Sequence, residues 1–226
     1  MRGMFDRIAG VYDLINTVMT MGLHHAWRER AADRAALEPG DAALDLCCGT
    51  GDLALALRER VGPSGRVVGA DFSEQMLELA REKASERGAR EVTFEWADAL
   101  ELPYADASFD AVTVGFGVRN LADLAAGFRE MRRVLKPQGR CVILEITQPQ
   151  KPPLSTFFAL WFDRIVPVIG RVAGDPDAYS YLPESVRGFP PPEGLARIMD
   201  EAGLEGIRYT VLAGGIIAIH SATRPA

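Results

Sequence analysis

The sequence predicts an α/β protein built on a mostly parallel sheet. Short apolar runs that suit buried strands alternate with helix-forming segments, which is the pattern of α/β folds. The clearest unit is the run 42–48, which passes through Gly49 and Gly51 into good helix formers that begin at Asp52. With 226 residues, 48% of them hydrophobic, the chain can bury one continuous core. We find no internal repeat or low-complexity linker and expect a single domain over residues 1–226.

The individual elements follow from apolar spacing, turn residues and caps. Strands are predicted where apolar runs are bounded by turn residues, namely at 42–48, 65–71, 92–96, 108–114, 140–146, 206–212 and 215–220. Helices are predicted where helix formers or helical apolar spacing dominate, namely at 4–32, 52–57, 74–87, 121–135, 156–162 and 192–202. Ser73 is the expected N-cap of the helix that begins at Glu74, and Gly139 closes the turn before the fifth strand.

Two segments are expected to cover a ligand. Residues 1–35 form a predicted helical lid, in which Tyr12 and Asn16 lie one helical turn apart; a solvated face is the alternative. Residues 148–192 hold many prolines around an aromatic helix, and we expect this insertion to form a roof over an apolar substrate. The alternative is that its rings extend the core.

Charge and cysteine content exclude several classes of protein. The net charge of −6 and the pI near 5.2 argue against a nucleic-acid partner, which needs clustered Lys and Arg. The three cysteines show no metal-ligand spacing, so we expect no metal site and a reducing, cytoplasmic location. The longest apolar stretch, 154–170, is interrupted by charged residues and a proline, so it should not span a bilayer. Contact with the surface of a membrane stays open.

The glycine turn predicts a nucleotide-type cofactor. Gly49, Gly51 and Ala54 make G-x-G-x-x-A, and Asp71 follows Gly51 by 20 residues, which also fits a dinucleotide site. The acidic residues near the turn distinguish a dinucleotide from S-adenosylmethionine. Asp45 just before the turn would repel a pyrophosphate, whereas S-adenosylmethionine carries an ammonium and a sulfonium that acids attract. We therefore expect S-adenosylmethionine, with a nicotinamide-dependent oxidoreductase as the rival.

Other polar residues follow the neighbouring strands at the same edge of the sheet. Asp71 ends the strand 65–71 and is placed to hold two ribose hydroxyls; a turn or capping role is the alternative. Asp98 and Ala99 follow the next strand and could bind an adenine through a carboxylate and a backbone amide. Arg119 and Asn120 come at the junction after the fourth strand, at the edge where ligands bind in open α/β sheets.

Several spaced motifs resemble the C-methyltransferases of ubiquinone and menaquinone biosynthesis, from Phe5 to His220. The motifs are 12–16 with Thr20, His24 and Trp27, then 116–120, then 133–139 with Glu145 and Thr147, and 181–187. The chain departs from the family pattern at four positions: Ile15 and Thr20 replace methionine and serine, Gln138 replaces glycine, and Gly115 replaces a frequent serine.

The resemblance implies a seven-stranded, Rossmann-like class I methyltransferase that uses S-adenosylmethionine. It places Thr50, Asp71, Asp98 and Ala99 at the cofactor, to which the turn adds Asp45, Gly49 and Gly51.

The implied reaction is methylation of a ring carbon of a prenylated quinol, with demethylmenaquinol favoured. We expect Arg119 to stabilise a phenolate while Asn120 and Tyr12 position the ring. A water oriented by Arg119 could take the proton, or Asp13 or His24 could take it instead.

Alternatives to this reaction stay open. They are a benzoquinol acceptor of the ubiquinone pathway, a catalytically silent cofactor-binding subunit, and methylation of oxygen or nitrogen on a soluble acceptor. A homodimer and a place at the inner face of the membrane are left open too.

Overall fold

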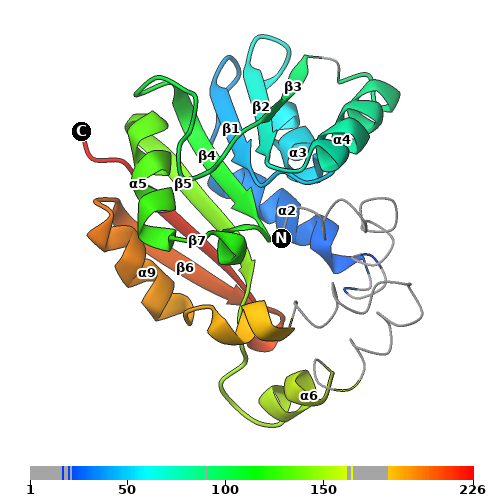
Figure 1. Cartoon of the computed structure of the whole chain (residues 1–226), viewed down its shortest axis with the longest axis vertical. Helices are drawn as coiled ribbons and strands as arrows, with labels where there is room; N and C mark the ends of the chain where they lie inside the picture. The colour runs from blue at the N-terminus through cyan, green and yellow to red at the C-terminus, as the bar shows by residue number, and fades with distance from the viewer. Residues whose placement is uncertain (1–16, 18–19, 21, 90, 162–163, 165–182) are drawn as a thin grey trace.

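The computed structural model describes residues 17, 20, 22–89, 91–161, 164 and 183–226. In these residues one seven-stranded sheet has the order β3-β2-β1-β4-β5-β7-β6 (Figure 1). The strands are β1 (Ala42–Leu46), β2 (Arg66–Asp71), β3 (Val92–Trp96), β4 (Phe109–Gly115), β5 (Leu135–Ile146), β6 (Glu205–Leu212) and β7 (Ile217–Thr223). The first five are parallel, and β7 runs antiparallel to both β5 and β6. The predicted seven-stranded, mostly parallel sheet is confirmed.

The strand order reverses between β1 and β4. From β1 the chain moves outward to β2 and β3, and then returns to place β4 on the other side of β1. The loops after β1 and β4 therefore leave the sheet in opposite directions, and such a switch point is where open α/β sheets bind ligands. The glycine turn that follows β1 lies at this point.

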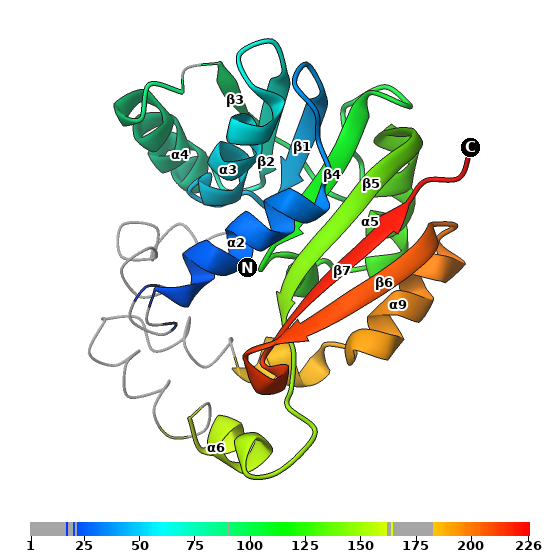
Figure 2. The same ribbon diagram turned by 180° about the vertical axis from the view of Figure 1, so that it is seen from behind.

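Helices cover both faces of the sheet (Figures 1 and 2). The helices are α2 (Leu23–Arg34), α3 (Asp52–Val61), α4 (Glu74–Glu86), α5 (Leu124–Val134) and α9 (Pro192–Glu201). Side chains of α2, α3 and α4 pack on one face, and those of α5 and α9 pack on the other. Alternate strand residues feed the two cores, so Val67 belongs to the first and Val68 to the second. This explains why the strands read as continuous apolar runs in the sequence.

Capping side chains set the start of two helices. α4 begins at Glu74 as expected, because Ser73 Oγ accepts a hydrogen bond from Met76 N at 3.3 Å. α5 begins at Leu124, three residues later than expected, because the Asp123 carboxylate accepts from Ala126 N at 2.9 Å. This second cap was not predicted from the sequence.

β5 begins five residues earlier than predicted. Leu135 already pairs with Phe109, and the pairing is irregular before Arg140 meets Ala111. Gln138 lies in this stretch with a φ of 65°, a left-handed conformation that is unfavourable for a residue with a Cβ. Glycine, which the resembled family has at this position, adopts a left-handed φ without this energetic cost.

We predict that Gln138→Gly stabilises the protein by about 1 kcal/mol, because it removes the left-handed strain. The hydrogen bond from Gln138 N to Arg224 O, at 3.0 Å, involves only backbone and is kept. Gly139→Ala is the control and should destabilise, since the new Cβ would lie 2.8 Å from Lys136 O. Urea unfolding measures both, and a Gln138→Gly variant less stable than wild type would contradict the prediction.

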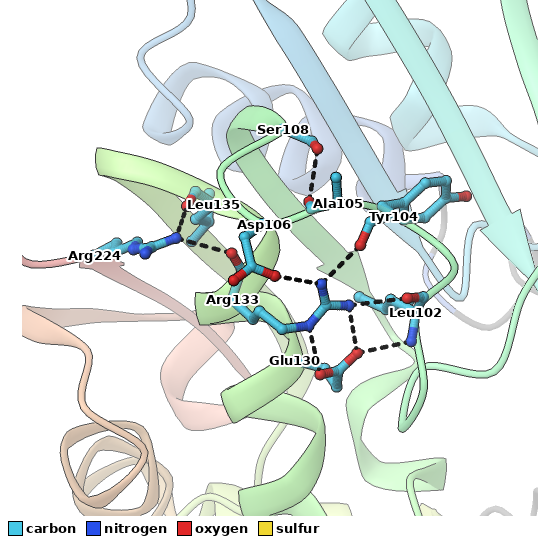
Figure 3. Close-up of polar contacts among 9 residues, drawn as sticks. All are labelled: Leu102, Tyr104, Ala105, Asp106, Ser108, Glu130, Arg133, Leu135 and Arg224. Atoms are coloured by element: carbon cyan, nitrogen blue, oxygen red, sulfur yellow. Dashed lines mark hydrogen bonds and ion pairs between the residues drawn. The ribbon is translucent and has the colours of Figure 1, made fainter.

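Arg133 fixes the loop between β3 and β4 onto α5 (Figure 3). Its guanidinium donates to Tyr104 O at 2.7 Å, Leu102 O at 2.9 Å and Asp106 Oδ1 at 2.8 Å. Glu130 on the same helix holds the guanidinium in place through Nε at 2.8 Å. One residue of the resembled motif 133–139 therefore has a structural role.

The predicted roof is described in part. α6 (Leu154–Leu160) follows β5 and lies beyond the carboxyl edge of the sheet (Figure 2). Phe158 packs on Val186, whereas Phe157 and Leu160 are 55% and 52% exposed. In the ranges that the structure describes, no helix has the length and apolar character needed to cross a membrane.

Candidate functional site

The backbone after β1 turns sharply and leaves room beside it. β1 ends at Leu46, two residues before the predicted end, because Cys47 takes a left-handed φ of 52°. Gly51 has a φ of 83°, and a Cβ there would lie 2.9 Å from the Phe94 ring, so this glycine serves close packing. Gly49 differs: no described atom lies within 4 Å of where its Cβ would be. The turn therefore has open space at Gly49, where a ligand could approach the backbone.

Asp71 holds this turn. Its Oδ2 accepts a hydrogen bond from Gly49 N at 2.9 Å, and its Oδ1 accepts one from Ser73 N at 3.0 Å. The turn-stabilising role that was the alternative for Asp71 is thus present, and a carboxylate oxygen can accept more than one hydrogen bond. A pyrophosphate at the turn would find the Gly49 N–H already occupied and a carboxylate beside it. The local geometry therefore disfavours a dinucleotide.

Asp45 places a second carboxyl group at the turn. It is 1% exposed, and its Oδ1 accepts from Thr113 Oγ1 at 2.7 Å, whereas no described group hydrogen-bonds to Oδ2. Burial raises the pKa of Asp45 to about 7, opposed by the Thr113 hydroxyl and the charge of Arg28. A buried carboxyl group with an uncommitted oxygen fits a ligand that carries positive charge, as S-adenosylmethionine does.

The raised pKa of Asp45 predicts a pH dependence of stability. The carboxyl is protonated up to about pH 7 in the folded protein but ionises near pH 4 when unfolded, so the stability it contributes is lost as the pH rises toward 7. We expect the free energy of unfolding of Asp45→Asn to lack this decline. Urea titrations of both proteins from pH 4.5 to 8 measure it, and parallel curves would contradict the assignment.

Asp98 and Ala99 lie where the sequence places them, directly after β3. The loop starts beside Asp71, because Ala97 N donates to Asp71 O at 3.2 Å. Asp98 is exposed and its Oδ1 accepts from Leu100 N at 2.9 Å, while Ala99 is buried. The two residues therefore lie at the same edge of the sheet as the glycine turn.

Thr50 contacts a lysine that the sequence analysis did not single out. Its buried Oγ1 accepts a hydrogen bond from Lys83 Nζ at 2.9 Å, and the same ammonium bonds to Asp52 Oδ1 at 2.8 Å. The Thr50 side chain is thus joined to α4 through Lys83 and lies at the glycine turn.

Arg119 forms a buried ion pair with Glu145. Its Nη1 lies 2.7 Å from Glu145 Oε1 and also donates to Phe116 O at 2.5 Å. The Arg119 backbone N–H donates to the second oxygen of Glu145 at 3.3 Å. Phe116 itself has a φ of 63°, which brings its carbonyl into this position. The loop after β4 is therefore locked to the end of β5 by charge and backbone together.

The structure brings together most of the predicted site. Asp45 lies near the end of β1, the glycine turn follows β1, and Asp71 is the last residue of β2. The Asp98 loop follows β3, and Arg119 with Asn120 follows β4. Tyr12 and Asp13 lie outside the described residues. The sequence analysis gave no role to Arg28 and Lys83 and did not pair Glu145 with Arg119, because these contacts join residues distant in the sequence.

Solved structures show the same fold. The chain matches a SAM-dependent methyltransferase from Aquifex aeolicus with a TM-score of 0.62 and 21% identity, over 87% of this chain and 89% of that one. It matches a SAM-dependent methyltransferase from Thermotoga maritima with a TM-score of 0.69 and 19% identity, over 99% of each chain. These matches, at 19 and 21% identity, show that the chain has the fold of the class I methyltransferases.

Sequence comparison gives the family. The model of the ubiE/COQ5 methyltransferase family matches residues 1–224. Demethylmenaquinone methyltransferase of Thermus thermophilus is 48% identical over 223 residues, which cover 98% of this chain and 100% of that protein. The Desulfitobacterium hafniense protein of the same name is 43% identical and is covered over 88% of its length. The chain belongs to the ubiE/COQ5 methyltransferase family.

Proposed function

We propose that the protein methylates a ring carbon of demethylmenaquinol, with S-adenosylmethionine as methyl donor, in menaquinone biosynthesis. The observation that carries the proposal is the full-length similarity to demethylmenaquinone methyltransferases at 42 to 48% identity. The described site supports it, because a carboxyl-lined glycine turn and a buried arginine follow adjacent strands, β1 and β4. No observation favours the benzoquinol, oxidoreductase or silent-subunit alternatives.

Residues at successive strand ends would hold S-adenosylmethionine. Asp98 and Ala99 would take the adenine, Asp71 the ribose hydroxyls, and the turn the methionine end, with Asp45 facing its ammonium. Thr50 would add a hydroxyl. The bound donor supplies a methyl group on a sulfonium, which a ring carbon can attack in line.

Arg119 would act on the acceptor. A quinol ring carbon is a weak nucleophile until the neighbouring hydroxyl loses its proton, so a fixed cation close to that oxygen favours the phenolate. Glu145 holds the Arg119 guanidinium in one orientation, which is what such a role needs. Arginine stays protonated and is unsuited as a base, so we assign the transfer of the proton to a water that Arg119 orients and that passes the proton on to bulk solvent. Asn120 and Tyr12 are proposed to position the ring.

Product analysis tests the function. Purified protein, S-adenosylmethionine and a reduced demethylmenaquinone with a short side chain should yield the menaquinone after reoxidation. Mass spectrometry should show a gain of one CH2, because a methyl group replaces a ring hydrogen. A prenylated benzoquinol of equal chain length that lacks the ring methyl group serves as the competing acceptor. Preference for the benzoquinol would overturn the naphthoquinol assignment, and protection by NAD but not by S-adenosylmethionine in a thermal melt would overturn the class of cofactor.

The prenylated substrate leads us to place α6 at the surface of a membrane. Phe157 and Leu160 are exposed on this helix, and Lys151 lies just before it. Exposed aromatic and aliphatic side chains favour the lipid–water interface, where a prenylated quinol is found.

We expect the double variant Phe157→Ser and Leu160→Ser to lose binding to vesicles of mixed neutral and anionic lipid in a flotation assay. Activity on a short-chain quinol should be kept, because the site residues are unchanged. The matched control is Tyr209→Ser with Val211→Ser, which removes exposed apolar side chains from β6. Equal losses in both double variants would contradict a membrane role for α6.

A further inference from the structure

The buried arginine of α2 lies beside the glycine turn. Arg28 is 8% exposed, and its Nη1 lies 3.6 Å from Asp52 Oδ2 at the start of α3. Its guanidinium carbon lies 5.5 Å from the centre of the Phe116 ring, which follows β4. Arg28 Nη1 also hydrogen-bonds to His24 Nδ1 on the same helix. Arg28 therefore connects α2 to the start of α3 and to the loop after β4, both of which lie at the switch point.

The charges around Arg28 leave room for an anion. Among the described residues, Asp52 is the acid that pairs with Arg28, and at 3.6 Å this contact is longer than a hydrogen bond. Asp52 lies closer to Lys83, at 2.8 Å. The pKa of Asp45, a second described carboxyl group near Arg28, is raised to about 7 by burial, so near neutral pH Asp45 carries only part of a negative charge. His24 and His25 also face this cluster and bring no negative charge.

The order of the strands tells which end of the cofactor reaches this position. In the proposed function the adenine lies at Asp98 after β3 and the ribose at Asp71 after β2. The sheet continues through β1 to β4, so the methionine end of the molecule must extend past the turn toward Phe116. That end is a zwitterion, with an ammonium and a carboxylate on one carbon. Asp45 and Arg28 are the matching charges.

We infer that Arg28 binds the carboxylate of the methionine moiety of S-adenosylmethionine. The fork of a guanidinium suits a carboxylate, and such a contact made in a buried site is strong. The inference rests on the proposed function, to which it adds a binding residue on α2. It also gives α2 a role in holding the cofactor in addition to its packing on α3.

The test compares two ligands that differ only in this carboxylate. Calorimetry should show that Arg28→Gln weakens binding of S-adenosylmethionine by about thirtyfold, as expected for loss of a charge-assisted pair. Binding of decarboxylated S-adenosylmethionine should change little. In wild type, the decarboxylated ligand should bind at least about tenfold more weakly than S-adenosylmethionine. This second comparison needs no variant and holds even if Arg28→Gln fails to fold.

The control is Arg60→Ala, which breaks the ion pairs of α3 with Glu29 and Asp33 on α2 but leaves Arg28 in place. It should affect both ligands equally. Equal losses for both ligands in Arg28→Gln, or equal affinities in wild type, would overturn the inference while the proposed function stands. A wild-type protein that binds neither ligand would instead overturn the proposed function, and the inference with it.

Discussion

Replacing Arg119 by alanine is expected to lower kcat by about two to three orders of magnitude, while the affinity for S-adenosylmethionine stays near that of wild type. The reason is that the guanidinium acts on the acceptor oxygen, where negative charge develops. The same change leaves Glu145, which is 1% exposed, without its cation, so the protein should also lose about 3 to 5 kcal/mol of stability. Single-turnover rates and calorimetric titration with the donor, at a temperature where the variant is folded, measure the two effects.

Arg133→Ala separates the loss of an ion pair from the loss of catalysis. It removes an Arg–Glu pair, with Glu130, on α5, and it should keep the wild-type kcat at saturating donor. Glu145→Gln adds a second comparison, because it keeps Arg119 but weakens its orientation. An Arg119→Ala protein with normal kcat, or with an equal loss of donor affinity, would contradict the role assigned to Arg119.

Replacing Asp71 by alanine should have the opposite profile. We expect the dissociation constant of S-adenosylmethionine to rise by about a hundredfold, because one carboxylate holds the Gly49 N–H and is assigned two ribose hydroxyls. With the donor at saturating concentration, kcat should change far less than in Arg119→Ala. Calorimetry measures the first quantity and initial rates the second.

Two variants sharpen the test of Asp71. Asp71→Asn keeps an acceptor oxygen for one backbone amide and should weaken binding less than alanine does. Ser73→Ala removes the cap of α4, which costs about 1 kcal/mol of stability, but leaves the carboxylate in place. If Ser73→Ala weakens the binding of S-adenosylmethionine as much as Asp71→Ala does, the effect is structural and the assignment of Asp71 to the ribose hydroxyls is wrong.

The sequence predicted the strands better than the sites where the backbone bends. β3 at Val92–Trp96 has the predicted bounds, because its apolar run stops at clear turn residues. β5 was predicted too short, since Pro137 and Gly139 indicated a turn in a stretch that still pairs with β4. Pairing depends on a distant partner strand, and local residue types do not report it.

The same distinction holds for the candidate site: residues at strand ends could be predicted, whereas contacts between distant segments could not. Asp71 and Asp98 could be predicted, because each lies at or just after the end of a strand and parallel strands end at one edge. The pairing of Arg119 with Glu145 could not be predicted, since 26 residues separate them and only the β4–β5 register brings them together. Arg28 was missed for a related reason: its neighbours come from α3 and the loop after β4.

The position of β7 between β5 and β6 bears on how the chain is made on the ribosome. The five parallel strands are complete once residue 146 has emerged, whereas β6 has to wait for β7, its neighbour in the sheet. Until then β5 is the edge of the nascent sheet, and its unpaired backbone is open to association with other chains. Nascent chains halted before Ile217 should therefore be more prone to aggregate than completed ones.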